Sequence, residues 1–321
     1  MATAQVTGPD DVNAVGRMLA LLGDEWTLLI VRESLLGARR FTDFAALPIS
    51  NAVLSNRLRS LVDDGLLERR IYQSQPPRAD YHPTEPCRAL WPVLVSIWHW
   101  ERTWVEDHTR SLPAMRHQGC GQDFSPVLRC GHCRQPVHVS DIDASWGPSG
   151  GWRRSVPRAV TRRRVRGVAS ADAGLFPETM AIFGNRWASA IMGAAFLGIR
   201  RFTDFQSRLS APGAVVADRL RLFCDIGVLQ AAAHPGRADW SEYHLTPKGL
   251  AFYPVIATSI HWGETYLGAA DGPALLFAHT ACGHPFVPEL GCDQCAEALA
   301  GSAIEIVAPQ RIEDLYGPPS R

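Results

Sequence analysis

The chain has 321 residues, of which 46% are hydrophobic and 20% are charged. This length suits about two ordinary domains, and this apolar content excludes a chain that is disordered throughout. Lys plus Arg (32) balance Asp plus Glu (32), which excludes a highly basic protein that coats DNA but leaves room for local basic patches. No stretch approaches the roughly 18 apolar residues of a membrane span, and the first residues lack an apolar secretory core. We therefore expect a cytoplasmic protein whose eight cysteines serve as thiols or metal ligands rather than as disulfides.

Three helices are predicted at the start of the chain. Apolar side chains at helical spacing indicate a first helix over residues 15–22. A second helix starts near Asp24 and ends at Gly37. Residues 41–44 open a short third helix, which stops at Pro48 because proline breaks a helix interior.

A fourth helix follows, for which Ser50 is a good N-cap. Val53, Leu54, Leu58, Leu61 and Val62 form its buried stripe, and Gly65 ends it.

A hairpin and a last helix complete this part of the chain. Residues 66–72 are predicted as a strand, residues 73–80 as a loop, and Tyr81 and His82 as the returning strand. Thr84 is the expected N-cap of a long final helix rich in aromatic residues. Helices of these sizes followed by a β-hairpin are typical of a winged helix-turn-helix.

The second half of the chain repeats the first. GDEWTLLIVRESLLGARRFTDF matches GNRWASAIMGAAFLGIRRFTDF at an offset of 161 residues, so that Trp26 pairs with Trp187. After one inserted residue the offset becomes 162, which pairs Trp100 with Trp262. A period this long indicates a duplicated domain rather than a solenoid.

Several segments of the first copy resemble the HxlR-type winged-helix regulators of bacteria. These segments are LLGDEWTLLIVRESLLGARRFTDF, LSNRLRSLVDDGLLERRIY and a Pro-Pro-Arg wing. The resemblance covers roughly residues 12–108 and, more weakly, 174–268. It implies an α+β fold with two tandem winged helix-turn-helix domains. Family members are usually single-domain homodimers, so the chain looks like a dimer fused into a monomer, which we call a pseudo-dimer.

The resemblance also implies a sequence-specific transcriptional regulator that binds double-stranded DNA, and we expect a repressor. Many members of the family carry a redox-active cysteine about thirteen residues before the matched tryptophan. Asn13 and Gly174 stand at those positions, so the thiol switch of that subgroup is not expected.

The fourth helix of the first copy is the expected recognition helix, because the N-terminal residues of such a helix meet base edges in the major groove. Arginines at the supporting helix and at the wing tip suit phosphates and the minor groove. The side chains expected to contact DNA are Arg39, Arg40, Thr42, Ser50, Asn51, Ala52, Ser55, Asn56, Arg57, Arg59 and Arg78. The alternative is a set of solvated polar positions on an ordinary helical domain.

The second copy departs from this pattern. Its recognition helix begins with proline, glycine and alanine, and Asp218, which repels phosphates, stands where Asn56 does. Arginines persist, so we expect this copy to position the protein more than it reads sequence. The residues expected to contact the DNA backbone are Arg200, Arg201, Thr203, Arg219, Arg221 and Arg237. The alternative is that the second copy serves only as the dimerisation partner.

An arginine-rich segment joins the two copies. GWRRSVPRAVTRRRVRG holds seven arginines and no acidic residue, namely Arg153, Arg154, Arg158, Arg162, Arg163, Arg164 and Arg166. Such a segment either neutralises several phosphates of a bound duplex or is a solvated linker.

Each copy ends in a cluster of cysteine and histidine. The predicted ligands are His117, Cys120, Cys130 and Cys133 in the first copy and His279, Cys282, Cys292 and Cys295 in the second. Four such ligands in two closely spaced pairs suit a structural Zn²⁺, so we expect a zinc-ribbon-like segment and one zinc ion in each copy. Disulfides or an oxidant-sensing thiol cluster are the alternatives, and His132, Asp123 or a water could be the fourth ligand of the first site.

The expected organisation is a winged helix at 12–112, a zinc segment at 113–145, a linker at 146–173, a second winged helix at 174–270 and a second zinc segment at 271–308. No motif of a phosphate-binding loop, dinucleotide fold, serine hydrolase or zinc protease is present, so we expect no enzyme. The aromatic last helices are expected to be core, or to line a pocket for a small-molecule effector. A thiol sensor and a zinc-stabilised protein adaptor are the competing classes.

Overall fold

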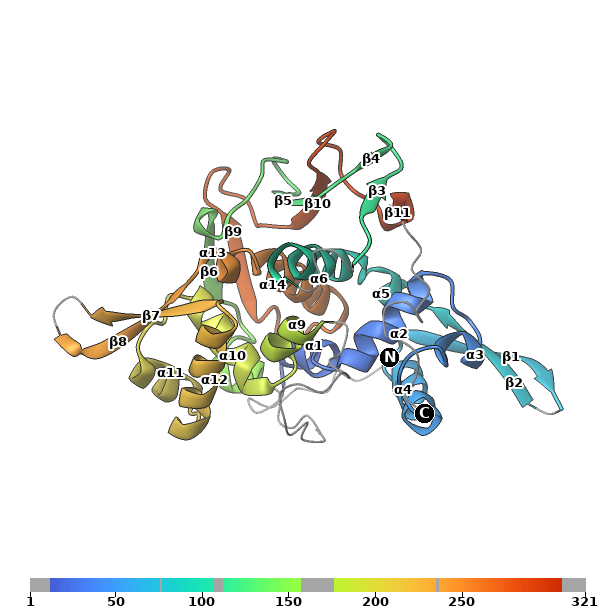
Figure 1. Cartoon of the computed structure of the whole chain (residues 1–321), viewed down its shortest axis with the longest axis horizontal. Helices are drawn as coiled ribbons and strands as arrows, with labels where there is room; N and C mark the ends of the chain where they lie inside the picture. The colour runs from blue at the N-terminus through green and yellow to red at the C-terminus, as the bar shows by residue number, and fades with distance from the viewer. Residues whose placement is uncertain (1–11, 76, 107–111, 157–175, 235–236, 308–321) are drawn as a thin grey trace. The chain divides into compact units, whose positions relative to one another are not determined.

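The computed structural model describes residues 12–75, 77–106, 112–156, 176–234 and 237–307 (Figure 1). It contains two compact units, each assembled from several stretches of the chain. The first unit comprises Met1–Gly23, Val127–Arg166 and Pro177–Gly291, and the second comprises Asp24–Pro126, Gly167–Phe176 and Cys292–Arg321. Each unit therefore combines segments of both sequence copies. Within the described residues, no helix combines the length and the apolar character needed to cross a bilayer.

The second unit contains the helices of the first winged helix. They are α2 (Glu25–Leu35), α3 (Phe41–Phe44), α4 (Asn51–Asp63), α5 (Glu85–Arg88) and α6 (Trp91–Trp104). The amide of Thr27 donates to Oδ1 of Asp24 at 3.0 Å, and that of Val53 donates to Oγ of Ser50 at 3.4 Å, so side chains cap α2 and α4. The predicted N-cap at Ser50 is confirmed, and Gly65, with φ of +73°, follows the end of α4.

The core of this winged helix comes from helical spacing of apolar residues. Leu54, Leu58 and Leu61 of α4 are buried, and α2 packs against both α4 and α6. The opposite face of α4 stays exposed, which is the orientation that a recognition helix needs.

The wing is longer than the sequence predicts. Strand β1 (Leu67–Ser74) pairs antiparallel with β2 (Pro77–Pro83), and the pairing extends to Ser74 opposite Pro77. The predicted loop over 73–80 is therefore wrong, because most of that segment belongs to the two strands. A ribbon exposed on both faces needs no apolar alternation, and a proline is tolerated at the start of a strand, so the local pattern resembles a loop.

The long final helix also begins later than predicted. Thr84 caps the short α5 by accepting from the amide of Cys87 at 3.5 Å, and α6 starts separately at Trp91. Proline stands in the first turn of each of these helices, where its missing N–H costs nothing.

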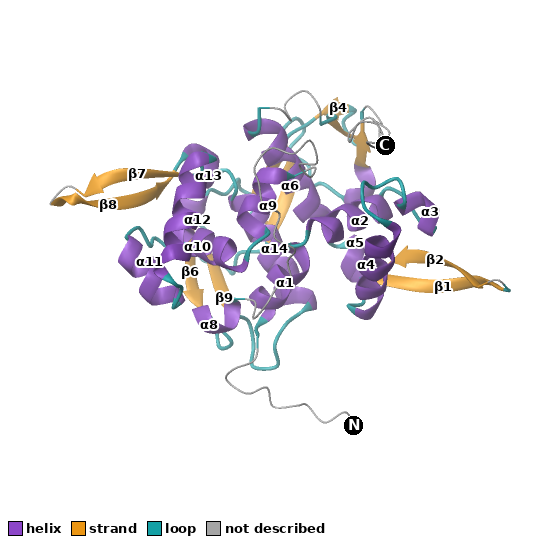
Figure 2. Ribbon diagram, turned by 60° about the horizontal axis from the view of Figure 1, so that its bottom comes forward, coloured by secondary structure: helices purple, strands orange, loops and turns teal. Residues whose placement is uncertain are grey.

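The first unit repeats this arrangement with segments of the second copy. Its helices are α1 (Ala14–Leu22), α8 (Trp152–Ser155), α9 (Pro177–Phe183), α10 (Arg186–Phe196), α11 (Phe202–Leu209), α12 (Gly213–Asp225), α13 (Pro247–Leu250) and α14 (Tyr253–Tyr266). Its wing is β7 (Leu229–His234) paired with β8 (Arg237–Leu245). Figure 2 shows both wings as two-stranded ribbons, that of β1 and β2 and that of β7 and β8.

Helix α1 comes from the first copy but packs with the second. It lies against α14, where a Cβ on Gly263 would come within 2.8 Å of Met18 Cβ. Asn13 fixes its N-terminus: the fully buried side chain accepts from the amide of Gly16 and donates to Ser149 O (3.1 Å) and Ser155 Oγ (2.8 Å).

The second unit receives a smaller contribution from the second copy. Phe176, from the second copy, is buried and packs edge-on against Trp98 of α6, with 6.4 Å between ring centroids. Its amide donates to a carboxylate oxygen of Glu25 at 3.3 Å. The helix exchange is not reciprocal, because α9, the counterpart of α1 at the offset of 161 residues, stays in the first unit and packs against α10 of its own copy.

The short strands after the winged helices pair in the same crossed way. They are β3 (Met115–His117), β4 (Gln122–Asp123), β5 (Pro126–Cys130), β6 (Ile142–Trp146), β9 (Leu275–His279), β10 (Pro288–Cys292) and β11 (Ile304–Ile306). In the second unit β3 pairs with β11, opposing His117 to Ile304, and in the first unit β9 pairs with β6, opposing His279 to Ile142. Strands β5 and β10 also pair with each other. Every one of these pairs except β3 with β4 therefore joins a strand of one copy to a strand of the other.

Candidate functional site

The second unit holds one cluster of possible metal ligands: His117, Cys120, Cys292 and Cys295. The Nδ1 atom of His117 lies 3.5 Å from Cys120 Sγ and 3.4 Å from Cys295 Sγ. The sulfurs of Cys120 and Cys292 are 3.9 Å apart. One histidine and three cysteines therefore converge on a common point.

The first unit holds the reciprocal cluster: Cys130, Cys133, His279 and Cys282. Here Nδ1 of His279 lies 3.3 Å from Cys282 Sγ and 3.4 Å from Cys133 Sγ. The sulfurs of Cys130 and Cys282 are 4.0 Å apart. The two clusters therefore have the same composition and nearly the same dimensions.

These dimensions fit a tetrahedral zinc ion. Bonds of about 2.3 Å to sulfur and about 2.0–2.1 Å to nitrogen place two sulfurs about 3.8 Å apart and a sulfur about 3.5 Å from a nitrogen. The separations of 3.9 and 4.0 Å between sulfurs, and of 3.3 to 3.5 Å between sulfur and nitrogen, agree with that geometry. All eight cysteines are free thiols, so none of them forms a disulfide. Metal ligation requires cysteines in this free form. A closed set of four ligands suits a structural ion rather than a catalytic one.

Local backbone geometry prepares these side chains for a metal. Gly121 and Gly283 each follow the cysteine that is three residues after the histidine of their cluster, with φ of +70° and +69°, which lets the chain turn around that ligand pair. The amide of Gln294 donates to Cys292 Sγ at 3.4 Å, and the amide of Gln122 lowers the pKa of Cys120. Amide donors stabilise thiolate, the form of cysteine that binds metal.

The two clusters consist of the eight predicted residues, whose role as metal ligands stays a prediction, but the predicted division into one cluster per copy is wrong. Each cluster takes a histidine and a cysteine from one copy and two cysteines from the other. Between Cys120 and Cys130 the chain forms strand β5 and passes from the second unit into the first, where Cys130 and Cys133 join the other cluster. The nine-residue spacing alone does not distinguish a returning hairpin from such a strand.

The other candidates for a fourth ligand have different partners. Asp123 pairs with Arg116 through an oxygen–nitrogen distance of 3.1 Å. His132 stacks on His284 with 3.4 Å between ring centroids.

The recognition helix of the first copy presents the predicted polar face. Ser50, Asn51, Ala52, Asn56 and Arg59 are exposed. Nη1 of Arg59 lies 3.4 Å from Oδ1 of Asn56, a weak contact that a base edge or phosphate can replace. Ser55, on the same helix, is half-buried. These residues lie where the prediction requires them, while their contact with DNA stays a prediction.

Two arginines of the predicted set are held by protein groups. Arg57 forms an ion pair of 2.7 Å with Asp24, the cap of α2, and Arg39 donates to the carbonyls of Ser34 and Ala38 at 2.7 Å. Both side chains brace the motif, so a DNA contact by either would have to compete with these bonds.

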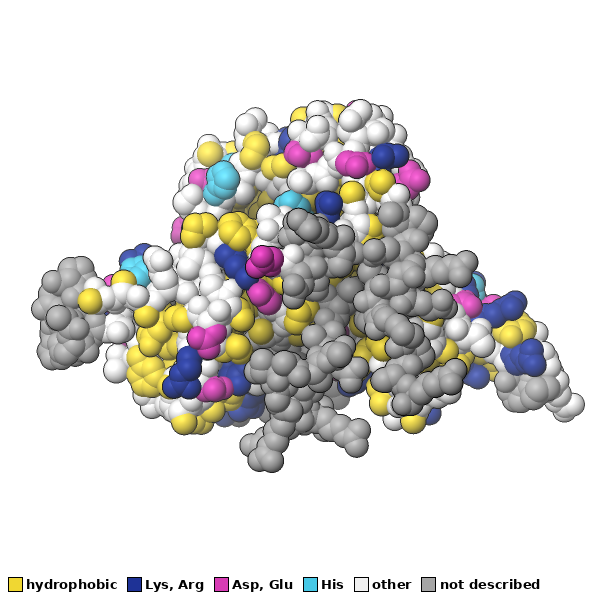
Figure 3. Space-filling model, viewed as in Figure 1, with side chains coloured by type: hydrophobic (Ala, Val, Ile, Leu, Met, Phe, Trp, Pro, Cys, Tyr) yellow, Lys and Arg dark blue, Asp and Glu magenta, His cyan; other side chains and the backbone are white. Residues whose placement is uncertain are grey.

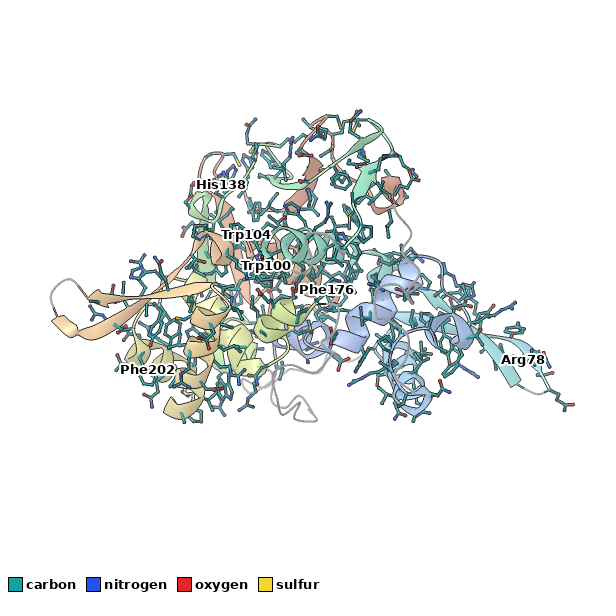
Figure 4. The ribbon with its side chains drawn as sticks, in the orientation of Figure 1. Arg78, Trp100, Trp104, His138, Phe176 and Phe202 are labelled. Atoms are coloured by element: carbon teal, nitrogen blue, oxygen red, sulfur yellow. The ribbon has the colours of Figure 1, made fainter. Side chains whose placement is uncertain are left out.

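The start of α3 and the wing are more open. Thr42 is exposed, and the exposed Arg40 lies 5.7 Å over the ring of Tyr72. Arg78 points outward from the end of the wing (Figure 4). Figure 3 shows basic side chains along this wing. Arg69 of β1 is exposed as well, although the sequence analysis named only the wing tip. Their exposure leaves the wing free to approach a duplex.

The second copy offers fewer side chains that are free to contact DNA. Pro212 precedes α12 without a side-chain capping bond, whereas Ser50 caps α4. Arg219 is engaged by Asp218 at 2.6 Å and Arg201 by Glu242 at 3.4 Å. The exposed members of its predicted set are Arg200, Thr203 and Arg221. Arg237 begins β8, and its side chain lies outside the described part of the chain.

The arginine-rich segment is described only at its start. Arg153 and Arg154 belong to α8, and Arg154 pairs with Asp271 at 2.7 Å. The other five arginines of this segment lie outside the described residues, namely Arg158, Arg162, Arg163, Arg164 and Arg166. The aromatic helices are core as expected, since Trp100 and Trp262 are buried, while Trp104 is partly exposed (Figure 4).

Both copies of the duplicated domain match a known protein family. The HxlR-like helix-turn-helix family matches residues 21–109 and 182–271, together more than half of the chain. An uncharacterized HTH-type transcriptional regulator of Mycobacterium tuberculosis is 36% identical over 149 residues, which are 46% of this chain and 94% of that relative. Another from Bacillus subtilis is 38% identical over 88 residues, 27% of this chain and 82% of the relative. A solved structure from Pseudomonas aeruginosa is 27% identical, covers 44% of this chain and 97% of its own, and has a TM-score of 0.35.

Proposed function

Because this chain belongs to the HxlR-like helix-turn-helix family, whose relatives are named as transcriptional regulators, we propose that it is a DNA-binding repressor that acts as a covalent pseudo-dimer. The two winged helices take the place of the two subunits of a dimer. Residues of the first copy read the operator sequence, and those of the second copy contact the DNA backbone. Two structural zinc ions brace the segments that join the copies.

The crossed assembly of the two units carries this proposal. Exchange of an element between protomers is a low-cost route to a dimer, and here α1 of the first copy packs against α14 of the second, while β3 pairs with β11 and β6 with β9 across the copies. The match to the mycobacterial relative spans 94% of that protein but only 46% of this chain, which supports a single-copy ancestor. Covalent linkage replaces a concentration-dependent association by an intramolecular one.

The zinc sites support the same assembly. Zinc would bind three thiolates and one imidazole at each cluster and act as a structural cross-link without catalysis. Because every cluster draws ligands from both copies, each would tie the Cys/His segment of one copy to that of the other. His117 and His279 are buried at their strand ends, which holds the imidazoles in place.

The difference between the two recognition helices gives the proposal its asymmetry. Asn56 is an exposed side chain that can donate to and accept from a base edge. Its counterpart, Asp218, is an exposed carboxylate that accepts only and already pairs with Arg219. Sequence reading therefore falls to α4, and the cationic side chains around α12 supply affinity that does not depend on sequence.

A selection from random duplexes followed by binding titrations tests this function. Asn56→Ala should weaken binding to the selected operator by about 5- to 150-fold, because a good base contact is worth about 1–3 kcal/mol. The matched change Asp218→Ala should leave affinity unchanged or improve it. Equal losses in the two variants would contradict the asymmetry, and absence of any duplex binding would favour a zinc-stabilised protein adaptor.

Repression is tested separately with a reporter gene behind the selected operator. We expect the intact chain to lower transcription from that reporter and Asn56→Ala to restore it. An increase in transcription by the intact chain would identify an activator.

A further inference from the structure

A cavity of about 130 Å³ lies within the first unit. It is enclosed by α1, α10, α14 and the strands β6 and β9, and nearly all of its lining is apolar. Members of this lining include Met18, Met192, Phe196, Ile260 and Phe277. Trp146 and Leu197 also line it and are more than a third exposed, so the cavity reaches the surface beside them.

Tyr253 supplies the free polar group of this cavity. The residue is 6% exposed, and its hydroxyl has no hydrogen-bond partner among the described residues. Burial raises the pKa of this hydroxyl, so it stays neutral and able to donate. The ring of Phe196 lies beside it, with 5.7 Å between ring centroids.

The other hydroxyls in the lining are already used. Ser155 Oγ accepts from the side-chain amide of Asn13 at 2.8 Å. Ser189 Oγ donates to backbone carbonyls at the end of α9, at 3.1 Å from Phe183 O. Among the hydroxyls of the described lining, that of Tyr253 is left without a partner; it is itself buried, so a bound molecule reaches it when the side chain turns toward the chamber.

The cavity depends on small residues that the first copy lacks. By the pairing of the two copies, Gly193 and Ser189 of α10 correspond to Arg32 and Leu28 of α2. A Cβ built on Gly193 meets no atom within 4 Å, so this glycine faces open space. At this face of the helix the second copy therefore has smaller side chains than the first, which leaves space for the cavity.

We propose that this cavity binds a molecule with one aromatic ring and one oxygen that forms a hydrogen bond with Tyr253. An apolar cavity of about 150 Å³ holds one benzene ring, so a chamber of about 130 Å³ has room for one ring but not for two. The regulatory part of this inference rests on the proposed function: α10 packs against α12, the recognition helix of the second copy, so occupancy of the cavity bears on DNA binding.

Direct binding to the full chain tests the site without DNA. Phenol and benzene are titrated separately, with binding followed by calorimetry. Phenol should bind more tightly than benzene by up to roughly tenfold, the value of one neutral hydrogen bond. Tyr253→Phe should abolish this preference while benzene still binds. Tyr266→Phe, which removes a hydroxyl from the same helix outside the cavity lining, should keep it. Absence of phenol binding, or a preference for phenol that survives in Tyr253→Phe, would overturn the proposal.

A cavity-filling variant gives an independent check. Gly193→Leu should abolish binding of both probes and raise the melting temperature, because it fills open space and removes a helix glycine. If that variant fails to fold, the smaller change Gly193→Ala should weaken phenol binding at least threefold with the fold intact. Unchanged affinity in the folded variant would show that phenol binds elsewhere and would overturn the site.

Operator affinity is then measured with and without saturating phenol. A change of at least threefold that is lost in Tyr253→Phe supports an effector site. Phenol binding with unchanged operator affinity would overturn the regulatory role alone. Phenol binding by a chain that binds no duplex would refute the proposed function while supporting the cavity.

Discussion

The crossed division of the metal ligands makes a prediction that zinc counting can decide. The intact chain should hold two zinc ions, one for each cluster. Cys120→Ser removes a ligand of the second unit's cluster and should leave one ion after mild chelation, since a site with three ligands loses metal much more readily. A second substitution, combined with Cys120→Ser, then shows which cysteines share an ion with Cys120.

Two double variants separate the two possible divisions. Cys120→Ser with Cys292→Ser damages one cluster twice and should retain one zinc ion per chain. Cys120→Ser with Cys130→Ser damages both clusters and should retain none. A ribbon closed within each copy predicts the reverse result, because Cys120 and Cys130 would then share an ion. One zinc ion retained by the second double variant would refute the crossed division.

The expected coordination can be worked from the separations. A tetrahedron whose edges are the 3.9 Å and 3.4 Å distances has a centre about 2.1–2.4 Å from its corners. X-ray absorption should therefore report three sulfurs near 2.3 Å and one nitrogen near 2.0–2.1 Å. Elemental analysis gives the count, and an intact chain free of zinc would refute metal ligation altogether. Folded stability should fall in chelator, because binding of a structural metal contributes to folding free energy.

Three further predictions concern stability and DNA affinity. Asn13→Ala removes a buried helix cap and two tertiary hydrogen bonds. It should lower the free energy of unfolding, measured in urea melts, by about 2–3 kcal/mol. A loss below about 0.5 kcal/mol would contradict the anchoring of α1. Burial raises the pKa of Glu264, so ionisation disfavours folding, and stability should decline as the pH rises from the unfolded pKa of about 4.5 through the folded value. Glu264→Gln should flatten that decline and be the more stable form at pH 7, and an unchanged pH profile would exclude the effect. Arg78→Ala should weaken binding to all duplexes alike and lower the slope of log affinity against log salt by about 1. A loss of affinity for one duplex sequence alone would instead indicate that Arg78 reads bases.

Local physical chemistry determines the parts that the sequence predicts well. Ser50 before an apolar stripe and Gly65 after it mark the ends of α4, because capping and positive φ are properties of single residues. The break between α5 and α6 had a signal of the same kind, since Pro92 in a first turn marks a second helix start.

Long-range pairing explains what local patterns miss. Two equal sets of ligands can close within a copy or between copies, and both solutions satisfy the same spacing. The choice depends on β3 pairing with β11 and β9 with β6, contacts between residues far apart in sequence. The cavity beside Tyr253 was likewise invisible, since its volume results from small side chains on separate elements. The small residues Gly193 and Ser189 are recognised as unusual when α10 is aligned with α2, which has Arg32 and Leu28 at these positions.

The reciprocal clusters also constrain how such a chain can change over generations. If half of the gene were deleted, the remaining product would keep a histidine with one cysteine and two further cysteines, each pair lacking the ligands that complete it. With the crossed pairing kept, such a fragment would complete a set of four ligands by joining a second fragment. The crossed pairing would make the duplication hard to reverse, whereas a substitution such as Asp218 in α12 leaves both sets of ligands intact.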